Sequence, residues 1–264
     1  DGSSVHQSGT TLDIPELNMN FRSEGIIAKS RKLKATWTPE FQQDINAYQS
    51  MDAEAEISAV MSEYVSMEID LEILDMLLQN ALTTTAWSAR LGIDFDSVNK
   101  TWVAVSSAAK YTQQEWFNTL GTKMQAVSNT IHTKTMRGGA NFAIVGPKIA
   151  TIIESMNGFK PATDGTKKKF AMGTETTGTA GNGNWTIYKN PYMQENAILM
   201  GYKGNAYLES GAAYCPYIPL ISTPVVLDPD DFTPRKGIMT RYAKKMLRPE
   251  FYGIIYVEGL QTIQ

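Results

Sequence analysis

The sequence has few of the residue types that build reactive or metal-binding sites, with one cysteine and two histidines in 264 residues. The single Cys215 excludes an intrachain disulfide and a zinc site held by several cysteines, and we expect it to be a small, buried apolar filler. His6 lies in a polar stretch and His132 near the end of a predicted helix. Neither position indicates the histidine of a Ser/His/Asp catalytic triad. The sequence therefore predicts no catalytic residues, no metal, no cofactor and no enzyme activity.

The sequence also lacks a long apolar run and an excess of basic residues. No segment approaches the roughly 18 uninterrupted apolar residues of a membrane-spanning helix. The first residues, DGSSVHQSGTT, do not have the layout of a signal peptide. The formal net charge is −3 and the pI is about 5.5, so contact with nucleic acid is expected to be non-specific. Charged residues make up only 19% of the chain, which fits a protein that hides much of its surface against partners.

Glycine and proline are absent from residues 52–82, where Ala, Glu, Met and Leu dominate. Because these are good helix formers, the segment predicts one long helix. Pro39, with Thr38 before it as a helix N-cap, predicts a short helix ahead of the long one. Two further helices are predicted, over residues 112–135 with Gly138–Gly139 as the C-terminal signal, and from Pro147 onward.

Strands are predicted where apolar and β-branched residues alternate or cluster between these helices. Residues 160–184 are rich in Gly, Thr and Lys and are expected to form an exposed loop, while the prolines from Pro216 to Pro234 indicate an irregular crossing. The last two strands are expected to form a hairpin joined at residues 248–250. Helices and strands without regular alternation predict an α+β fold. The predicted strands cover residues 17–21, 26–38, 102–105, 141–145, 185–188, 197–202, 238–247 and 251–257.

An acidic stripe is predicted on the second half of the long helix, where Glu68, Glu72 and Asp75 stand at i, i+4 and i+7. Apolar residues occupy most other directions, so these carboxylates must meet water or a cation. Without a histidine at metal spacing, a metal site fits less well than a solvated stripe, or than pairing with Lys and Arg of the same or a neighbouring subunit. The candidate partners are Arg22, Lys29, Arg31, Lys32 and Lys34, and also Arg241, Lys244, Lys245 and Arg248.

Residues 30–78 closely resemble the major capsid proteins of T-even-type bacteriophages. The order is specific: a basic SRKLKA strand, a WTPEF helix start, and DAEAE at the opening of the long helix. Residues 240–257 (TRYAKKMLRPEFYGIIYV) resemble the same family. The segments NFAIVGPKIATII, YKNPYMQENAILMGYKG and AYCPYIPL do so as well. The resemblance covers most of the chain.

The resemblance implies a Hong Kong 97-like capsid fold, with the long helix as its spine helix. Members of this family carry more chain ahead of the spine helix, so we expect either a fragment or a reduced member. The insertion domain and the maturation cleavage site of such proteins therefore have no assigned counterpart here. The resemblance implies four segments: residues 1–36 as the N-terminal segment and returning strands of an extended loop, 37–105 as the peripheral domain with the spine helix, 106–225 as the axial domain, and 226–264 as the last strands of the peripheral domain.

The resemblance also implies the function of a major capsid protein, which assembles into hexamers or pentamers of an icosahedral or prolate head shell around phage DNA. The expected location is the virion, after assembly in the host cytoplasm. The expected partners are copies of the chain itself and vertex, portal and decoration proteins, with no membrane. The extended loop would place Arg22 to Lys34 against an acidic surface of a neighbouring subunit, for which the stripe of Glu68, Glu72 and Asp75 is the candidate. The alternatives are a vertex protein of the same phages, an encapsulin-like compartment shell, and a metal-dependent hydrolase that uses the acidic stripe.

Overall fold

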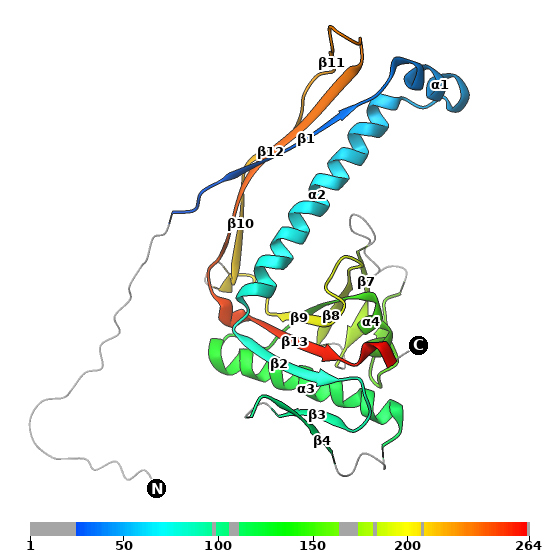
Figure 1. Cartoon of the computed structure of the whole chain (residues 1–264). Helices are drawn as coiled ribbons and strands as arrows, with labels where there is room; N and C mark the ends of the chain where they lie inside the picture. The colour runs from blue at the N-terminus through cyan, green and yellow to red at the C-terminus, as the bar shows by residue number, and fades with distance from the viewer. Residues whose placement is uncertain are drawn as a thin grey trace, which may run out of the picture.

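The central element is α2 (Ala53–Asn80), a 28-residue helix that runs from a sheet-and-helix body to the far end of a narrow arm (Figure 1). Asp52 caps this helix, its side chain accepting a hydrogen bond from the Glu54 amide at 3.0 Å. The helix confirms the prediction over residues 52–82. The computed structural model describes residues 25–96, 99–105, 111–163, 174–181, 184–206 and 209–262. The predicted strand at residues 17–21 and the candidate Arg22 lie outside these ranges.

The short helix α1 (Pro39–Gln49) precedes α2 and lies beside its N-terminal end (Figure 1). The Thr38 side chain caps α1 as predicted, accepting from the Phe41 amide at 3.3 Å. Ser50 ends the helix in the left-handed conformation, with φ of 52°. The chain therefore turns sharply between the two helices.

The arm is a four-stranded antiparallel sheet built from β1 (Lys29–Thr36), β10 (Ala212–Ser222), β11 (Val226–Leu227) and β12 (Pro234–Met246). The strand β12 lies in the middle, and β1, β10 and β11 all pair with it. The irregular crossing expected from the prolines is wrong, because proline is compatible with an edge strand and with bulges. Pro216 and Pro219 lie on the edge strand β10, where the pairing register with β12 shifts.

The body contains a seven-stranded mixed sheet in the order β2-β13-β9-β5-β8-β7-β6. The strand β13 pairs parallel with β2 and antiparallel with β9. The strand β5 pairs parallel with β8 and antiparallel with β9. A separate hairpin, β3 (Ile93–Asp96) and β4 (Thr101–Ala104), lies below the body in Figure 1. The body strands are β2 (Thr83–Ser88), β5 (Phe142–Val145), β6 (Lys160–Pro161), β7 (Glu175–Ala180), β8 (Trp185–Lys189), β9 (Ala197–Gly201) and β13 (Tyr252–Glu258).

Two apolar cores cover the two faces of the body sheet. The helices α3 (Gln113–Thr135) and α4 (Pro147–Glu154) pack on one face, with Leu120 and Ile149 fully buried. The C-terminal half of α2 packs on the other face through Leu77 and its neighbours. On β9, Ile198 and Met200 belong to the first core and Leu199 to the second. This double coverage explains why β9 is apolar along its length.

Most other local predictions are confirmed, but two more are wrong. The expected hairpin between the last strands does not exist, since β12 lies in the arm and β13 in the body. They are separated by a 3-10 turn, η4 (Pro249–Phe251), and a second such turn, η5 (Leu260–Thr262), follows β13. The expected loop over residues 160–184 contains β7, whose alternating burial shows that small residues there still pack. The helix α3 ends at Met136 in the left-handed conformation, with φ of 53°, ahead of the expected glycines.

The segment boundaries expected at residues 105 and 225 do not follow the sheets. The strand β2 precedes residue 105 but shares the body sheet with β5 to β9. The strand β10 precedes residue 225 but shares the arm sheet with β12, and β13 then returns to the body. Both sheets therefore join segments that are far apart in the sequence, which local patterns do not reveal.

Candidate functional site

The arm is anchored on α2 by a cluster of charged side chains. The Arg31 guanidinium on β1 donates to Glu68 and Glu72, with 2.7 Å between Arg31 Nη2 and Glu72 Oε2. Lys244 on β12 lies 2.9 Å from Glu72 Oε1 and also donates to the Glu72 carbonyl oxygen. The Tyr242 hydroxyl donates to Glu72 and accepts from Arg31 Nε at 3.3 Å. We name Arg31, Glu68, Glu72, Tyr242 and Lys244 the anchor cluster.

Hydrogen bonds to the charged forms set the direction of the pKa shifts of Glu72 and Arg31. Burial by itself raises the pKa of Glu72, whereas hydrogen bonds from Tyr242, Arg31 and Lys244 lower it to about 2. The hydrogen bond to Glu72 is the main cause that raises the pKa of Arg31. Burial, and then the contact with Glu72, raise the pKa of Tyr242. Glu72 is therefore held as a carboxylate, and its role in the chain is to bind two strands to one helix.

A second ion pair lies nearer the free end of the arm. Lys236 on β12 donates to Glu54 of α2 at 2.7 Å, and only 12% of the Lys236 side chain is exposed. On the same strand, Arg235 pairs with Asp228 in the turn between β11 and β12. Lys236, Tyr242 and Lys244 are separated by even numbers of residues along β12, so their side chains lie on the same face of the strand, towards α2. The arm is thus attached to α2 at both ends of its length.

The structure brings together some of the predicted site residues and separates others. Arg31, Glu68 and Glu72 meet within one chain. Asp75 is exposed and has no partner among the described side chains. The role of Tyr242 was not predicted, although its place in the alternation of β12 is the signal that would have found it. Lys29, Lys32 and Lys34 are exposed and likewise have no polar partner in the part of the chain that the structure describes.

The arm exposes a large share of its apolar side chains on β10, β11 and the turn before β12. Tyr217 is 73% exposed and Phe232 is 70% exposed. The expectation that Cys215 is a buried filler is wrong, since it is exposed on the edge strand β10. We name the exposed set the arm surface: Tyr214, Tyr217, Leu220, Ile221, Val226, Leu227 and Phe232.

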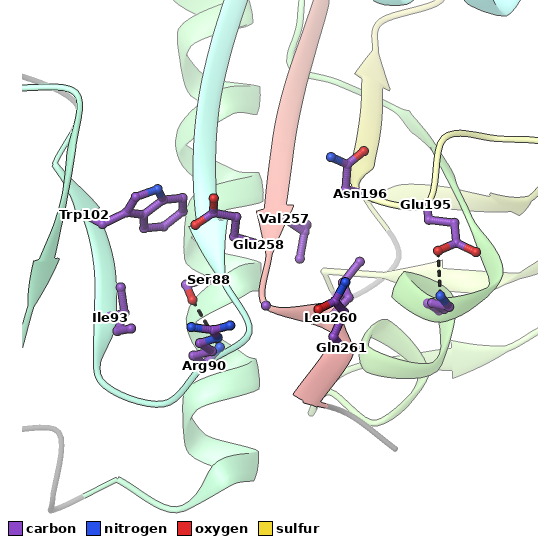
Figure 2. A pocket seen from close by; sticks show the side chains of 12 residues that line it. Ser88, Arg90, Ile93, Trp102, Glu195, Asn196, Val257, Glu258, Leu260 and Gln261 are labelled. Atoms are coloured by element: carbon purple, nitrogen blue, oxygen red, sulfur yellow. Dashed lines mark hydrogen bonds and ion pairs between the residues drawn. The ribbon is translucent and has the colours of Figure 1, made fainter.

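The body has two open cavities that are large enough to hold a small molecule. The first, of about 660 Å³, lies at the ends of β2 and β13 and is shown in Figure 2. Its Ser88 hydroxyl accepts from the Arg90 amide at 3.1 Å, and its Lys148 pairs with Glu195 at 2.6 Å. Its described lining includes no histidine or cysteine that could activate a nucleophile. The cavity therefore has no arrangement typical of catalysis.

The second cavity, of about 940 Å³, lies between α2 and the body sheet. Its lining combines apolar residues of α2 with several asparagines, and Asp70 is the single carboxylate among the described lining residues. Burial raises the pKa of Asp70. Among the described residues, no group of three or more His, Cys, Asp or Glu side chains is arranged to hold a metal ion. In the same residues, no helix has the length and apolar character needed to span a membrane.

The fold matches those of solved phage capsid and encapsulin structures. The capsid of Myoviridae phage XM1 matches with a TM-score of 0.54 at 10% identity, over 88% of this chain and 74% of that one. The encapsulin SrpI of Synechococcus elongatus PCC 7942 matches with a TM-score of 0.53 at 10% identity, over 87% of this chain and 74% of that one. These likenesses define the class as the Hong Kong 97-like capsid fold, as the sequence resemblance implied.

Within this class, the chain belongs to the family of the major capsid protein Gp23, whose model matches residues 2–263. The major capsid protein of Enterobacteria phage T4 is 31% identical over 247 residues, which cover 89% of this chain and 46% of that protein. The major capsid protein of Vibrio phage KVP40 is 29% identical over 238 residues, which cover 86% of this chain and 45% of that protein. The chain therefore spans about half the length of the curated relatives that it matches.

Proposed function

We propose that this chain is a major capsid protein that assembles with copies of itself into the head shell of a bacteriophage, and that it acts by assembly and not by catalysis. The observation that carries the proposal is the arm surface, seen together with membership of the major capsid protein family. The chain works in the virion shell, around the phage genome. Contact with DNA is non-specific, consistent with the net charge of −3.

The arm surface supports assembly because exposed apolar area of this extent is costly for a chain that remains alone. Val226 and Leu227 are 60% and 61% exposed, and Phe232 beside them is held at a positive φ of 53°. A bulky residue in that conformation is uncommon and suggests that its position serves a contact. Repeated contacts of this kind, each modest, sum to a stable shell.

The proposed interface between subunits also includes those charged residues predicted from the sequence that are exposed in the structure. Lys29, Lys32, Lys34 and Asp75 are available to a neighbouring subunit, whereas Arg31, Glu68 and Glu72 are engaged within the chain. Arg22 remains a candidate for the same interface. Vertex, portal and decoration proteins are further proposed partners of the completed shell.

Electron microscopy and sedimentation of the purified chain test this proposal. Closed shells, or hexameric and pentameric tiles, are expected at high protein concentration. A monodisperse monomer over the full concentration range would contradict it. In particles, a high copy number distinguishes a major capsid protein from a vertex protein, and packaged DNA distinguishes it from a compartment shell that holds an enzyme.

A further inference from the structure

The helix α1 (Pro39–Gln49) is complete but unsupported. It has 11 residues and caps at both ends, yet none of its residues is buried in the chain. A helix of this length is marginal in water without packing on one face. The helix lies beside the N-terminal end of α2 at the far end of the arm (Figure 1). A partner that covers α1 would therefore supply stabilisation that the single chain does not provide.

One face of α1 combines exposed aromatic rings with unpaired acidic groups. Phe41 and Tyr48, two turns apart on this face, are 45% and 86% exposed. Glu40 and Asp44 flank the rings on one side at i and i+4. Both carboxylates are exposed and have no partner among the described residues. We name Glu40, Phe41, Asp44 and Tyr48 the α1 surface.

The outer edge of β1 has the complementary character. Among the described residues, β1 pairs with β12 alone, and no described strand pairs with its other edge. Lys32 and Lys34 share one face of the strand and Lys29 lies on the other face, and all three are exposed without a described polar partner. Two apolar side chains accompany them, Ile27 at 87% and Leu33 at 37% exposure. We name Ile27, Lys29, Lys32, Leu33 and Lys34 the β1 surface.

Two of the three carboxylates of the stripe on α2 are already engaged within the chain. Glu68 and Glu72 already bind Arg31, and Glu72 also binds Lys244, within the same chain. Within the described residues, no ion pair joins Glu40 or Asp44 of the α1 surface to Lys29, Lys32 or Lys34 of the same chain. At about 3.3 Å per residue, Lys29 also lies about 23 Å from Thr36, the end of β1 next to α1.

We propose that the α1 surface of one copy docks on the β1 surface of the next copy, with Glu40 and Asp44 facing the lysines and the aromatic rings facing Ile27 and Leu33. This inference rests on the proposed assembly function. Each copy carries both surfaces at separate places, so the contact is head-to-tail and generates a ring when the rotation closes. The opposite charges fix partner choice and register, and the rings supply the apolar contact.

Charge reversal tests the pairing. Both Glu40→Lys with Asp44→Lys, and Lys32→Glu with Lys34→Glu, are expected to reduce the assembled fraction about tenfold or more through like-charge repulsion. The chain with all four substitutions restores the opposite charges and is expected to assemble again. Gln43→Lys with Asn46→Lys adds the same charge to other faces of α1 and is the matched control, which is expected to assemble. Circular dichroism of each variant checks that it folds.

Zero-length carbodiimide crosslinking of the wild-type chain provides a measurement that needs no variant. Assemblies of mixed ¹⁴N and ¹⁵N chains are expected to give crosslinks between copies, from Lys32 or Lys34 to Glu40 or Asp44. If the wild-type chain does not assemble, the proposed function fails. If it assembles but gives no such crosslink, or if both reversals assemble normally, this contact is wrong while the function stands. If reversal blocks assembly and the fourfold variant does not recover, α1 docks on a different partner surface.

Discussion

Arg31 Nη2 on β1 lies 2.7 Å from Glu72 Oε2 on α2, and this ion pair connects the first strand of the arm to the long helix. The contact joins residues 41 positions apart in the sequence. Tyr242 and Lys244 bring the strand β12 to the same carboxylate. One glutamate therefore fixes how the arm crosses the helix, and the arm surface depends on that crossing for its placement.

Replacement of Glu72 by glutamine is expected to destabilise the chain by about 1–3 kcal/mol, because Arg31 and Lys244 lose their charged acceptor while they remain half-buried. Urea denaturation of the unassembled chain measures the change. Asp75→Asn is the matched control on the same helix and is expected to change stability by no more than about 0.5 kcal/mol, since Asp75 is exposed. Equal effects of the two substitutions would contradict the role of the anchor cluster.

The depressed pKa of Glu72 predicts a pH dependence. The pKa falls from 4.5 to about 2, so the folded chain keeps the carboxylate charged where the unfolded chain binds a proton. The stabilisation is therefore fully present above pH 4.5 and is lost as the pH falls towards 2. Thermal denaturation between these values is expected to show a loss of about 1–3 kcal/mol that is absent from Glu72→Gln. The prediction fails if both proteins lose stability in parallel.

The sequence predicted the local elements well where the signal is contained within one segment. The predicted cap at Thr38 forms, and the next two helices start where expected, capped by Asp52 and Thr112, because N-capping depends on residues two or three positions apart. The pairing of Glu72 with a basic strand was also among the predictions. Local chemistry therefore determined the helices and part of the anchor cluster.

The sequence did not predict that the consecutive strands β12 and β13 lie in different sheets. The turn-like join at residues 248–250 gave no sign that the two strands part at Pro249, although residues 238–247 are mixed and residues 251–257 are nearly all apolar. The distinction arises from packing: β13 is covered on both faces by the body cores, whereas β12 faces α2 on one side only. Exposure of β10 is likewise a consequence of its edge position.

The exposed Cys215 offers a probe of the arm surface. A maleimide reagent is expected to label it rapidly in the unassembled chain. Assembly is expected to slow the labelling about tenfold or more if a neighbouring copy covers β10. Since this is the single cysteine of the sequence, the rate reports one position, measured by intact mass spectrometry. Equal rates in chains and shells would place β10 outside every interface.

The arm surface also predicts the outcome of removing apolar groups. Val226→Ser with Leu227→Ser is expected to weaken assembly about tenfold or more while it changes the stability of the unassembled chain by less than about 0.5 kcal/mol, because both side chains are largely exposed. Sedimentation velocity measures the assembled fraction. Met136→Ser, at an 85% exposed position beyond α3, is the control and is expected to assemble normally. An arm variant that assembles as well as this control would exclude these two residues from the interface.

The close approach of α3 to the body sheet predicts a cost at Gly253 on β13. A Cβ atom there would lie 2.6 Å from Val127 Cγ1, and Val127 is buried against the sheet and cannot withdraw. Gly253→Ala is therefore expected to destabilise the unassembled chain by about 1–3 kcal/mol through overpacking, although alanine alone would favour the folded state by restricting the unfolded chain.

Gly25→Ala has nothing within 4 Å of the added atom and provides the control, with an expected change near zero. Urea denaturation compares the two, and a second substitution, Val127→Ala, is expected to recover part of the loss at Gly253 by making room for the methyl group. If Gly253→Ala proves as stable as the unsubstituted chain, then α3 does not pack against β13 as closely as the structure shows.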